Sequence, residues 1–395
     1  MSISKKIKNF MEQGSWIRKM FEEGEALKQK LGQDNIYDLS LGNPIIGPPK
    51  QFYSKLKELA SNPIEGMHRY MPNAGYLETR SAVANQLKIE TGLNFDYSHL
   101  VMSIGAGGAL NVVMKTILDS EDEVIIFAPY FVEYIFYADN HNAKCKVVNS
   151  DSNFLPKLDE LENAITAKTK MVLICSPGNP TGVIYKPETL SAISKILSNK
   201  EKTLGTEITL VSDEPYRKII FDNIKYPHIF DFHHKSIVAT SHSKDLSIPG
   251  ERIGYIAVNP NYENNKEIID GLTFCNRTLG FVNAPALMQR IIVSLQNVAI
   301  DVSDYERKRD FLFDELTNIG YSVVKPDGAF YMFPQSPTPD EIPFVEELKT
   351  QRILVVPGTG FGTPGHFRIA YCVDDSVLRN SIHGFKKAFE KYKVS

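Results

Sequence analysis

The sequence predicts an α/β protein with a mostly parallel seven-stranded sheet, helices on both faces of that sheet, and a smaller α+β domain beside it. Seven short runs have strand composition, and the central ones are nearly all apolar. Helix-length segments separate most of these runs, and the pattern changes near residue 285. Apolar strands that alternate with helices are typical of a parallel sheet buried on both faces. The seven runs are residues 100–104, 124–127, 146–148, 171–175, 208–213, 236–240 and 253–258.

The chain beyond residue 285 predicts the smaller domain. Its helical stretches are longer, and its short apolar runs are interrupted by glycine and proline turns. The expected order is helical stretches at 286–295 and 302–319, apolar runs at 321–324 and 328–333, a helix, a turn at 357–362, a strand at 367–371 and a terminal helix.

Residues 16–27 have the apolar spacing of an amphipathic helix and form an expected amino-terminal arm. This arm packs either on its own domain or across a subunit interface. The expected division is an arm with part of the small domain at 1–45, a large domain at 46–285 and a small carboxy-terminal domain at 286–395.

Composition limits the classes of function. The chain has 395 residues, 43% hydrophobic and 23% charged, as in ordinary globular proteins. Its formal net charge of −3 gives no reason to expect nucleic acid or an anionic membrane as a partner. The four cysteines are far apart and form no Cys-x-x-Cys, which argues against a disulfide framework and favours a reducing compartment.

Targeting and metal signals are also missing from the sequence. No apolar run reaches membrane-spanning length, and the first residues lack the apolar core of an export signal. We therefore expect a cytoplasmic protein with no membrane partner. Because there is no HExxH, EF-hand or Cys/His cluster, we predict no metal site.

One lysine, Lys244, lies in a polar loop between the last two predicted strands, and Arg252 follows eight residues later. The hydroxyls of Ser241, Ser243 and Ser247, together with this arginine, can hold a phosphate beside the lysine. A lysine near cationic groups can become an amine nucleophile for Schiff-base chemistry. The alternative is an exposed lysine in a surface salt bridge.

A glycine-rich run at 105–108 separates the first predicted strand from a helical segment. The backbone amides of Ala106 and Gly107, at the positive end of a helix dipole, suit a phosphate. The run is not the dinucleotide fingerprint, because Leu110 stands in the place of the third glycine.

Polar or aromatic residues follow five of the predicted strands. In open α/β sheets, ligands bind at the carboxyl ends of the strands, so these positions form one candidate site. They are Gly105, the pair Tyr130 and Phe131, residues 176–179, Asp213 and residues 241–244.

Four motifs occur in a characteristic order: Ser-Pro-Gly-Asn-Pro-Thr-Gly at 176–182, Ser-Asp-Glu-Pro-Tyr at 212–216, Ser-His-Ser-Lys at 241–244 and Phe-Arg-Ile-Ala-Tyr at 367–371. Together they resemble the class I aminotransferases, the relatives of aspartate aminotransferase, over about residues 38–368. The resemblance implies the transferase fold type I of enzymes that use pyridoxal 5'-phosphate, and a homodimer with two shared active sites.

The resemblance also implies a role for each residue at the cofactor ring. Lys244 is the covalent tether and general base, Asp213 pairs with the ring N–H, and Tyr216 donates to the phenolic oxygen. Asn179 contacts the same oxygen and the substrate carboxylate, and Phe131 stacks on the ring. From the residues alone, a strand-end acid is equally a helix cap, and the loop around Asn179 a simple turn.

The remaining implied roles concern the phosphate and the substrate. Gly42 lies against the substrate α-carboxylate, and Arg368 clamps it; a lone arginine in a strand is otherwise a surface pair. Residues implied to hold the phosphate are Ala106, Gly107, Ser241, Ser243, Arg252 and, from the neighbouring subunit, Tyr70. Family members often carry Ser or Thr where this chain has Gly107, so one hydroxyl is lost there.

Substrate choice is where the chain departs from the family pattern. Some aspartate-type members hold the side-chain carboxylate with an arginine of the neighbouring subunit, shortly before an Asn-x-Pro. Here the aligned residue is Thr278, and its neighbour Arg277 is the candidate replacement. Either Arg277 binds dicarboxylates, which we favour, or the pocket prefers neutral amino donors.

The resulting prediction is a pyridoxal-phosphate-dependent aminotransferase that moves an amino group from an L-amino acid, aspartate-type or broad, to a 2-oxo acid such as 2-oxoglutarate. One alternative is a lyase or an aminocyclopropane carboxylate synthase-like enzyme on the same scaffold. A second is a regulator that binds the cofactor without turnover, although such proteins carry a DNA-binding domain for which the arm is too short.

Overall fold

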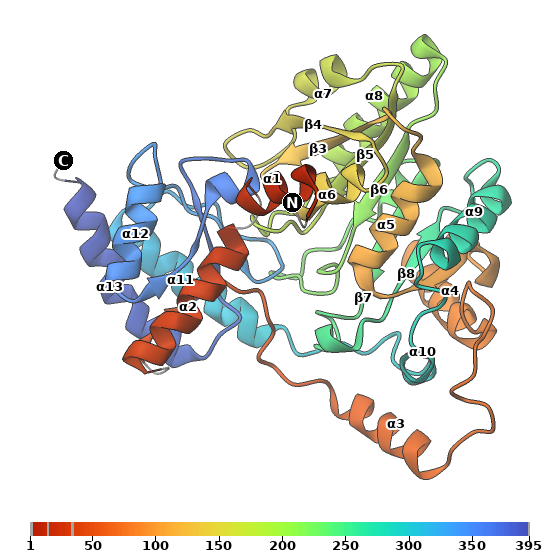
Figure 1. Ribbon diagram of the computed structural model, residues 1–395, viewed down its shortest axis with the longest axis horizontal. Coiled ribbons are helices and arrows are strands. Elements are labelled where there is room, and N and C mark those ends of the chain that lie inside the picture. Colours follow the sequence, from red (N-terminus) through yellow and green to blue (C-terminus); the bar gives the residue numbers. More distant parts are fainter. Residues whose placement is uncertain (1–2, 14–15, 33–34, 394–395) are drawn as a thin grey trace.

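The computed structural model describes residues 3–13, 16–32 and 35–393, and a seven-stranded sheet forms its centre (Figure 1). The strand order is β2-β8-β7-β6-β5-β3-β4. The strands are β2 (Leu100–Ser103), β3 (Glu123–Ala128), β4 (Lys144–Asn149), β5 (Thr169–Cys175), β6 (Thr209–Asp213), β7 (Ser236–Ser241) and β8 (Gly254–Val258).

The sheet is mostly parallel, which confirms the predicted fold class. β3 pairs in parallel with β4 and β5, and the parallel pairing continues through β6 to β7. Only β8 runs against its neighbours β2 and β7. The chain order reverses between β3 and β5, and such a switch point opens a crevice at the carboxyl ends of the two strands.

Both faces of the sheet are buried, which explains why its strands are apolar without alternation. Along β5, Val172 and Ile174 pack into the core on one face, while Met171 and Leu173 pack into the core on the other. The first core includes residues of α3 (Lys50–Ser61), α4 (Leu77–Thr91), α7 (Leu158–Ala164), α8 (Pro187–Leu204) and α10 (Ala286–Ile292). The second includes residues of α5 (Gly105–Ile117), α6 (Glu133–Asp139) and α9 (Asn265–Thr278).

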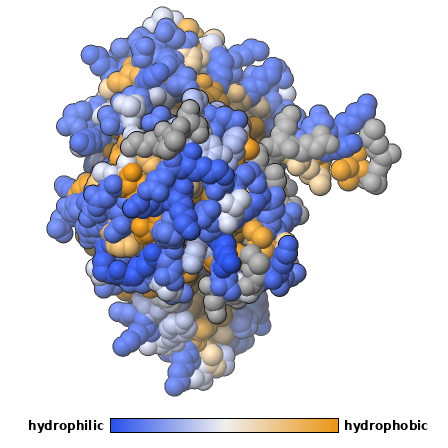
Figure 2. All heavy atoms as spheres, turned by 90° about the vertical axis from the view of Figure 1, so that its left-hand side faces the viewer, coloured by the Kyte–Doolittle hydropathy of each residue, from blue (hydrophilic) through white to orange (hydrophobic). Residues whose placement is uncertain are grey.

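A separate hydrophobic core lies beside the sheet, among the amino-terminal and carboxy-terminal segments (Figure 1). The molecular surface over this core, on the side of the carboxy-terminal helices, is mostly hydrophilic (Figure 2). Its helices are α2 (Trp16–Leu31), α11 (Ser303–Ile319), α12 (Ile342–Thr350) and α13 (Asp375–Lys393). Its strands are β1 (Tyr37–Asp38) paired with β10 (Ile353–Leu354), and β11 (Val356–Pro357), β12 (Phe367–Ala370) and β9 (Tyr331–Met332) in one small sheet.

The expected amino-terminal arm is helical and packs on its own chain. In α2, Met20 is buried in the core beside the sheet, Lys28 pairs with Asp38 at 2.9 Å, and Glu23 pairs with Lys349 at 2.9 Å. The side chains at 16–19 and at 21, which helped to predict this helix, lie outside the described residues. The preceding α1 (Lys5–Gln13) contacts α6, where Lys6 and Asp139 form an ion pair of 2.6 Å.

One local expectation was wrong. The glycine-rich run 105–108 does not separate the strand from the helix, because α5 begins at Gly105 itself. Gly105 has φ of +78°, and a Cβ there would stand 2.7 Å from the Arg252 guanidinium, so the close approach of these segments requires glycine. The apolar run at 321–324 forms no strand, and β9 covers only two residues of the run at 328–333.

Within the described ranges, none of the helices combines the length and the apolar character needed to cross a bilayer. In the same ranges, His, Cys, Asp and Glu side chains do not gather in groups of three or more that could hold a metal ion.

Candidate active site

A pocket of about 310 Å³ opens at the carboxyl edge of the sheet. It lies at the β3/β5 switch point and is bounded on its far side by residues of β9 and β12. It gathers the predicted site residues Gly42, Ala106, Gly107, Phe131, Asn179, Asp213, Tyr216, Ser241, Ser243, Lys244, Arg252 and Arg368. Its other lining residues are Leu41, Leu110, Tyr134, Tyr137, Cys175, Pro215, Pro249 and Tyr331.

Lys244 extends into this pocket from the loop after β7. Its Nζ donates to the backbone oxygen of Gly42 at 2.8 Å and lies 5.4 Å from the centre of the Phe330 ring. Burial lowers the pKa of Lys244 from 10.5 to about 8, with Arg368 and Arg252 acting in the same direction and Cys372 opposing. A lysine with such a pKa is partly an uncharged amine near neutral pH, the form that reacts with carbonyl carbons.

Asp213 ends β6 and is buried at the floor of the pocket. One carboxylate oxygen, Oδ2, accepts a hydrogen bond of 2.7 Å from the Tyr134 hydroxyl, whereas Oδ1 is buried without a partner. Burial raises the pKa of Asp213 to about 6, although the Tyr134 hydrogen bond lowers it. A buried carboxylate oxygen without a partner is costly, so this atom is arranged to receive a donor or a cation.

Tyr216, in the segment after β6, lines the pocket beside Tyr331 of β9. Its hydroxyl is 2.9 Å from the Tyr331 hydroxyl, so a contact between β9 and the segment after β6 closes this wall. The same Tyr331 explains why residue 42 is glycine, since a Cβ at Gly42 would stand 1.8 Å from the Tyr331 hydroxyl oxygen. The chain at Gly42 can therefore approach the pocket only without a side chain.

Arg368 comes from β12 and is fully buried at the opposite wall. Its guanidinium donates to Asn179 Oδ1 at 3.0 Å and to the backbone oxygen of Ser40, and Nε has no partner. It also lies over the rings of Tyr331 (4.7 Å) and Phe361 (4.9 Å). Burial lowers the pKa of Arg368, but arginine stays cationic in proteins, so this wall presents a fixed positive charge that suits a carboxylate.

Apart from Tyr70 and Ser247, the phosphate-binding residues implied by the sequence all line this pocket. The first turn of α5 supplies free backbone amides, which is the usual way that a helix N-terminus binds an anion. Ser241 Oγ lies 3.0 Å from Ser243 Oγ, and the Arg252 guanidinium donates to Pro249 O at 3.0 Å. These groups are all donors or cations, as an anion requires.

The space beside Gly107 is occupied by a hydroxyl from another element. A Cβ at Gly107 would stand 2.8 Å from the hydroxyl oxygen of Tyr137 on α6. A larger side chain at position 107 would therefore require Tyr137 to move.

Three tyrosines of the site were not predicted: Tyr134, Tyr137 and Tyr331. Tyr134 and Tyr137 follow Phe131 at spacings of three and six residues, a helical periodicity that could have placed them on one face with it. Phe131 and Tyr134 form an edge-to-face pair with ring centres 5.7 Å apart. For Tyr331 no local signal exists, because it reaches Tyr216 across 115 residues of sequence.

Several predicted residues do not line the pocket of their own chain, namely Gly105, Tyr130, residues 176–178, His242, Ser247, Tyr70 and Arg277. The Ser247 hydroxyl, expected to help hold a phosphate, instead donates to the backbone oxygen of Ile46. Tyr70 is 89% exposed. Arg277 is exposed on α9, with its guanidinium 5.3 Å from the centre of the Phe274 ring, and the neighbouring Thr278 is exposed as well. Tyr70 and Arg277 were predicted to act in a neighbouring subunit, and these two roles stay predictions.

A lysine of lowered pKa and a buried carboxylate line one pocket at the carboxyl edge of an α/β sheet, together with the amino end of a helix and a buried arginine. This combination defines an enzyme of amine and carbonyl chemistry on a carboxylate-bearing substrate. The family model described as aminotransferase class I and II matches residues 34–385, and the chain belongs to this family.

Individual relatives agree with the family match. The chain is 30% identical over 398 residues to the probable aspartate aminotransferase of Methanocaldococcus jannaschii, covering 98% of this chain and 100% of the relative. It is similar to a crystal structure of an aminotransferase from Eubacterium rectale, with a TM-score of 0.96, 38% identity and 99% of each chain covered. It is also similar to aspartate aminotransferase of Thermus thermophilus with maleate, with a TM-score of 0.87, 25% identity and 98% and 100% coverage.

The protein is therefore an aminotransferase, and the family and fold predicted from the motifs are confirmed. The class I and II family uses pyridoxal phosphate. These matches do not favour the alternative that the protein is a lyase, since the relatives are named as aminotransferases.

Proposed function

We propose that this pocket binds pyridoxal 5'-phosphate and transfers the amino group of an L-amino acid to a 2-oxo acid such as 2-oxoglutarate. The observation that carries the proposal is the buried Oδ1 of Asp213, which has no partner and lines the same pocket as Lys244. A protonated ring nitrogen is the kind of donor that such an oxygen requires. The donors at the start of α5 and at Arg252 fit the phosphate group of the same molecule.

When bound, pyridoxal phosphate supplies a carbonyl carbon that condenses with amines and a ring that takes up the electron pair released at the substrate α-carbon. Lys244 would hold the cofactor through its Nζ. The Lys244 amine would also take the α-proton of the substrate as general base, since burial lowers its pKa to about 8 and leaves part of it uncharged near neutral pH.

Pairing with the positively charged ring nitrogen would keep the Asp213 carboxylate deprotonated. The hydrogen bond from Tyr134 fixes the orientation of the carboxylate, so that Oδ1 remains directed toward this partner. Tyr216 and Asn179 carry the hydroxyl and amide donors proposed for the phenolic oxygen, and Phe131 is the proposed aromatic cover of the ring.

Arg368 would bind the α-carboxylate of the substrate. Its fork now donates to Asn179 Oδ1 and to the Ser40 carbonyl, and Nε has no partner, so a bound carboxylate would replace a neutral acceptor with a charged one. Gly42, which can carry no side chain there, leaves room for that carboxylate.

We further propose that two chains form a homodimer in which each active site receives Tyr70 from the partner subunit. The nearly full exposure of Tyr70 in its own chain supports this arrangement. Mixing Tyr70→Ala protein with Lys244→Ala protein is expected to regenerate heterodimers with one intact site. If activity stays absent after subunit exchange is verified, Tyr70 acts within its own chain or not at all.

We propose a dicarboxylic amino donor of the aspartate type. Support comes from the relatives named aspartate aminotransferases and from the exposure of Arg277, as expected of a side chain that acts in the partner subunit of the proposed homodimer. Arg277→Ala is expected to lower kcat/KM for aspartate about 10-fold or more, with little effect on alanine or methionine. An equal loss on every donor, or on none, would remove Arg277 from the specificity pocket.

A panel of amino donors with 2-oxoglutarate tests the overall proposal. The expected products are glutamate and the matching 2-oxo acid in equal amounts. Release of ammonia with pyruvate from a cysteine conjugate, without glutamate, would support the lyase instead.

Two further parts of the proposal concern organisation and location. Residues 46–285 would form one domain around the sheet and residues 286–395, with 1–45, a second. Most residues of the hydrophobic core beside the sheet come from the latter two segments, which supports this division. Tyr216, Ile219 and Phe221 also join that core, and α10 packs into the core of the sheet. A cytoplasmic location agrees with four cysteines that are all free thiols.

A further inference from the structure

Two chain segments carry the central residues of the pocket, and each of them has a second, polar side. Segment 213–218 follows β6, and segment 241–245 follows β7. Toward the pocket they present Asp213, Tyr216, Ser243 and Lys244. On the other side they line a small buried cavity of about 10 Å³ with Glu214, Arg217, Lys218, His242 and Asp245.

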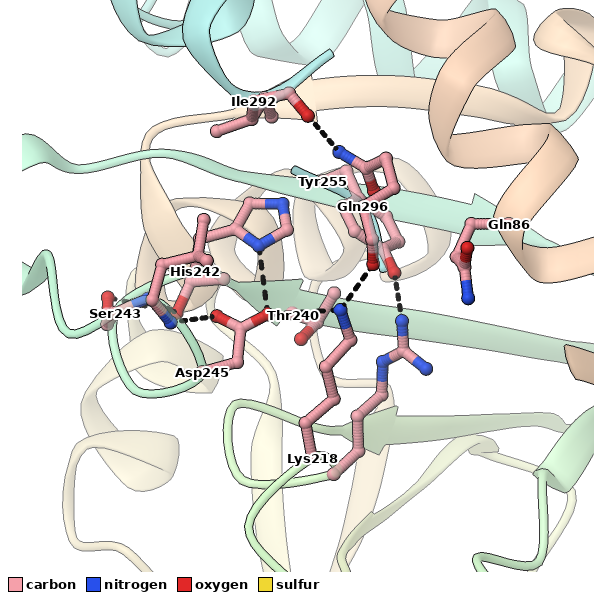
Figure 3. Close-up of polar contacts among 12 residues, drawn as sticks. Gln86, Lys218, Thr240, His242, Ser243, Asp245, Tyr255, Ile292 and Gln296 are labelled. Atoms are coloured by element: carbon pink, nitrogen blue, oxygen red, sulfur yellow. Dashed lines mark hydrogen bonds and ion pairs between the residues drawn. The ribbon is translucent and has the colours of Figure 1, made fainter. Parts of the chain in front are cut away.

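Asp245, the residue after Lys244, is the centre of this second side (Figure 3). Its Oδ2 lies 3.0 Å from His242 Nδ1 and 3.6 Å from Lys218 Nζ, and its Oδ1 accepts from the Leu246 amide at 2.9 Å. The side chain is only 8% exposed. Burial alone would raise the pKa of Asp245, but His242, Lys218 and Arg217 bring it below its ordinary value.

Lys218 connects Asp245 to the segment that carries Asp213 and Tyr216 (Figure 3). The same ammonium donates to the backbone oxygen of Gln296 at 2.6 Å, and Gln296 in turn donates to Ile292 O at 2.8 Å. The Ile300 amide also donates to the backbone oxygen of Asp245 at 2.8 Å. The loop with Lys244 is thus anchored from behind to two other parts of the chain.

A parallel set of contacts fixes the neighbouring residues. Arg217 pairs with Glu90 of α4 at 2.5 Å and donates to the Tyr255 hydroxyl of β8 at 2.9 Å. Thr240, at the end of β7, donates to the backbone oxygen of Glu214 at 2.8 Å. The two segments are therefore joined directly, behind the pocket, by a hydrogen bond and by the pair of Lys218 and Asp245.

We propose that Asp245, held between His242 and Lys218, is a positioning residue that fixes Lys244 relative to Asp213 and Tyr216. The inference rests on the proposed function, because it concerns the alignment of the tethering lysine with the carboxylate expected to face the ring. Asp245 itself lines only the rear cavity, so it acts through the backbone of its loop and touches neither cofactor nor substrate.

The test compares Asp245→Asn, which keeps the size of the side chain and removes its charge, with Glu201→Gln as matched control. Glu201 forms an ion pair of 3.1 Å with Lys235, the residue just before β7. This ion pair therefore lies at the end of β7 opposite to the end that leads to Asp245. Three quantities are measured: kcat and KM, the lysine labelled by borohydride in the cofactor-loaded protein, and the pH midpoint of Lys244 acylation in the cofactor-free protein.

For Asp245→Asn we expect borohydride to label Lys244 as in wild type. The kcat should fall about 10- to 100-fold with KM changed less than about threefold, as expected when aligned groups are displaced. The acylation midpoint should rise from about 8 toward 10.5, because a loosened loop admits water to Lys244. Glu201→Gln should lower the melting temperature and change neither kcat nor the midpoint.

The double variant Lys218→Met with Asp245→Asn separates positioning from simple charge pairing. Asp245→Asn leaves Lys218 without its carboxylate partner and should therefore lower the melting temperature. Removing Lys218 as well should restore the melting temperature, while kcat stays low because the connection between the two segments is still missing. If Asp245→Asn does not fold, Lys218→Met alone breaks the connection and should lower kcat in the same way.

Three results would overturn the inference: wild-type kcat and midpoint in Asp245→Asn, recovery of kcat together with stability in the double variant, or unchanged kcat in Lys218→Met. Borohydride labelling of another lysine in the wild-type protein would instead refute the proposed function. The two failures are thus distinguishable.

Discussion

Two sets of buried polar groups, one at each end of the central sheet, differ in how many hydrogen-bond partners they have, although the amino end also holds one buried atom without a partner, His233 Nε2. At the carboxyl end, Asp213 Oδ1 and Arg368 Nε are buried without partners. At the amino end, the side-chain amide of Asn259 donates to Phe230 O, His233 O and Ser236 Oγ, each at 3.1 Å, and its oxygen accepts from the Asn261 amide at 3.0 Å.

This difference separates binding from stability. A fully bonded buried amide contributes to folding, because every one of its lost hydrogen bonds with water is replaced. Buried groups that lack hydrogen-bond partners instead raise the free energy of the unliganded fold. A ligand that supplies the missing partners removes this cost when it binds. Substitutions at the carboxyl end should therefore change turnover, and substitutions at the amino end should change stability.

The largest expected effect is that of Lys244→Ala. Loss of the proposed tether and general base should lower the transamination rate at least about 10⁴-fold. The cofactor-free variant should melt at the same temperature as wild type or above it, since a buried ammonium of lowered pKa is removed. Activity assays and thermal melting check both halves, and an inactive variant that is also strongly destabilised would contradict the contrast between the two ends.

Asp213→Asn should have the next largest effect. The amide keeps a partner for Tyr134 and loses the charge that would stabilise a protonated ring, so abstraction of the α-proton should slow about 10²- to 10³-fold with the cofactor still bound. Single-turnover kinetics with an α-deuterated amino acid would measure this step. Near-normal turnover would make Asp213 a structural cap.

Asn259→Ala, at the amino end, should leave kcat and KM near the wild-type values. It removes the amide that holds three acceptors and leaves them buried, so the free energy of unfolding should fall by about 2–3 kcal/mol. Urea denaturation measures this quantity. A large loss of kcat in a variant of normal stability would show that the two ends are not separate in function.

The smallest expected effect concerns pH. Between its ordinary value of 3.8 and about 6, Asp213 binds more protons in the folded protein than in the unfolded chain. The contribution of this group to stability is therefore present below pH 3.8 and is lost as the pH rises through about 6. In cofactor-free protein, Asp213→Asn should remove this fall from the pH profile of the melting temperature, and an unchanged profile would contradict the raised pKa.

The sequence predicted those features that are local or periodic. The seven strands were recognisable because runs such as 171–175 are buried on both faces, and the site residues were recognisable because each follows such a strand. The start of α5 was misjudged because glycine disfavours helices. Gly105 is retained there by the proximity of Arg252, which is 147 residues away in the sequence and visible only in the fold.

Contacts between elements that are distant in the chain could not be predicted from the sequence. The bond between Tyr216 and Tyr331 and the pair of Lys218 and Asp245 depend on how loops pack after the sheet has formed. A tyrosine or a charged residue at those positions has many other uses, so no spacing rule indicates its partner. The residues that complete the pocket wall and anchor the lysine loop were found only through the structure.

The most direct test of the central claim is to identify the lysine that holds the cofactor. Purified protein is loaded with pyridoxal phosphate, reduced with borohydride, digested, and mapped by mass spectrometry. One labelled site per chain is predicted, at Lys244, because it is the pocket-lining lysine of lowered pKa opposite Asp213. A label on another lysine, such as Lys218 on the rear side of the same loops, would contradict the account.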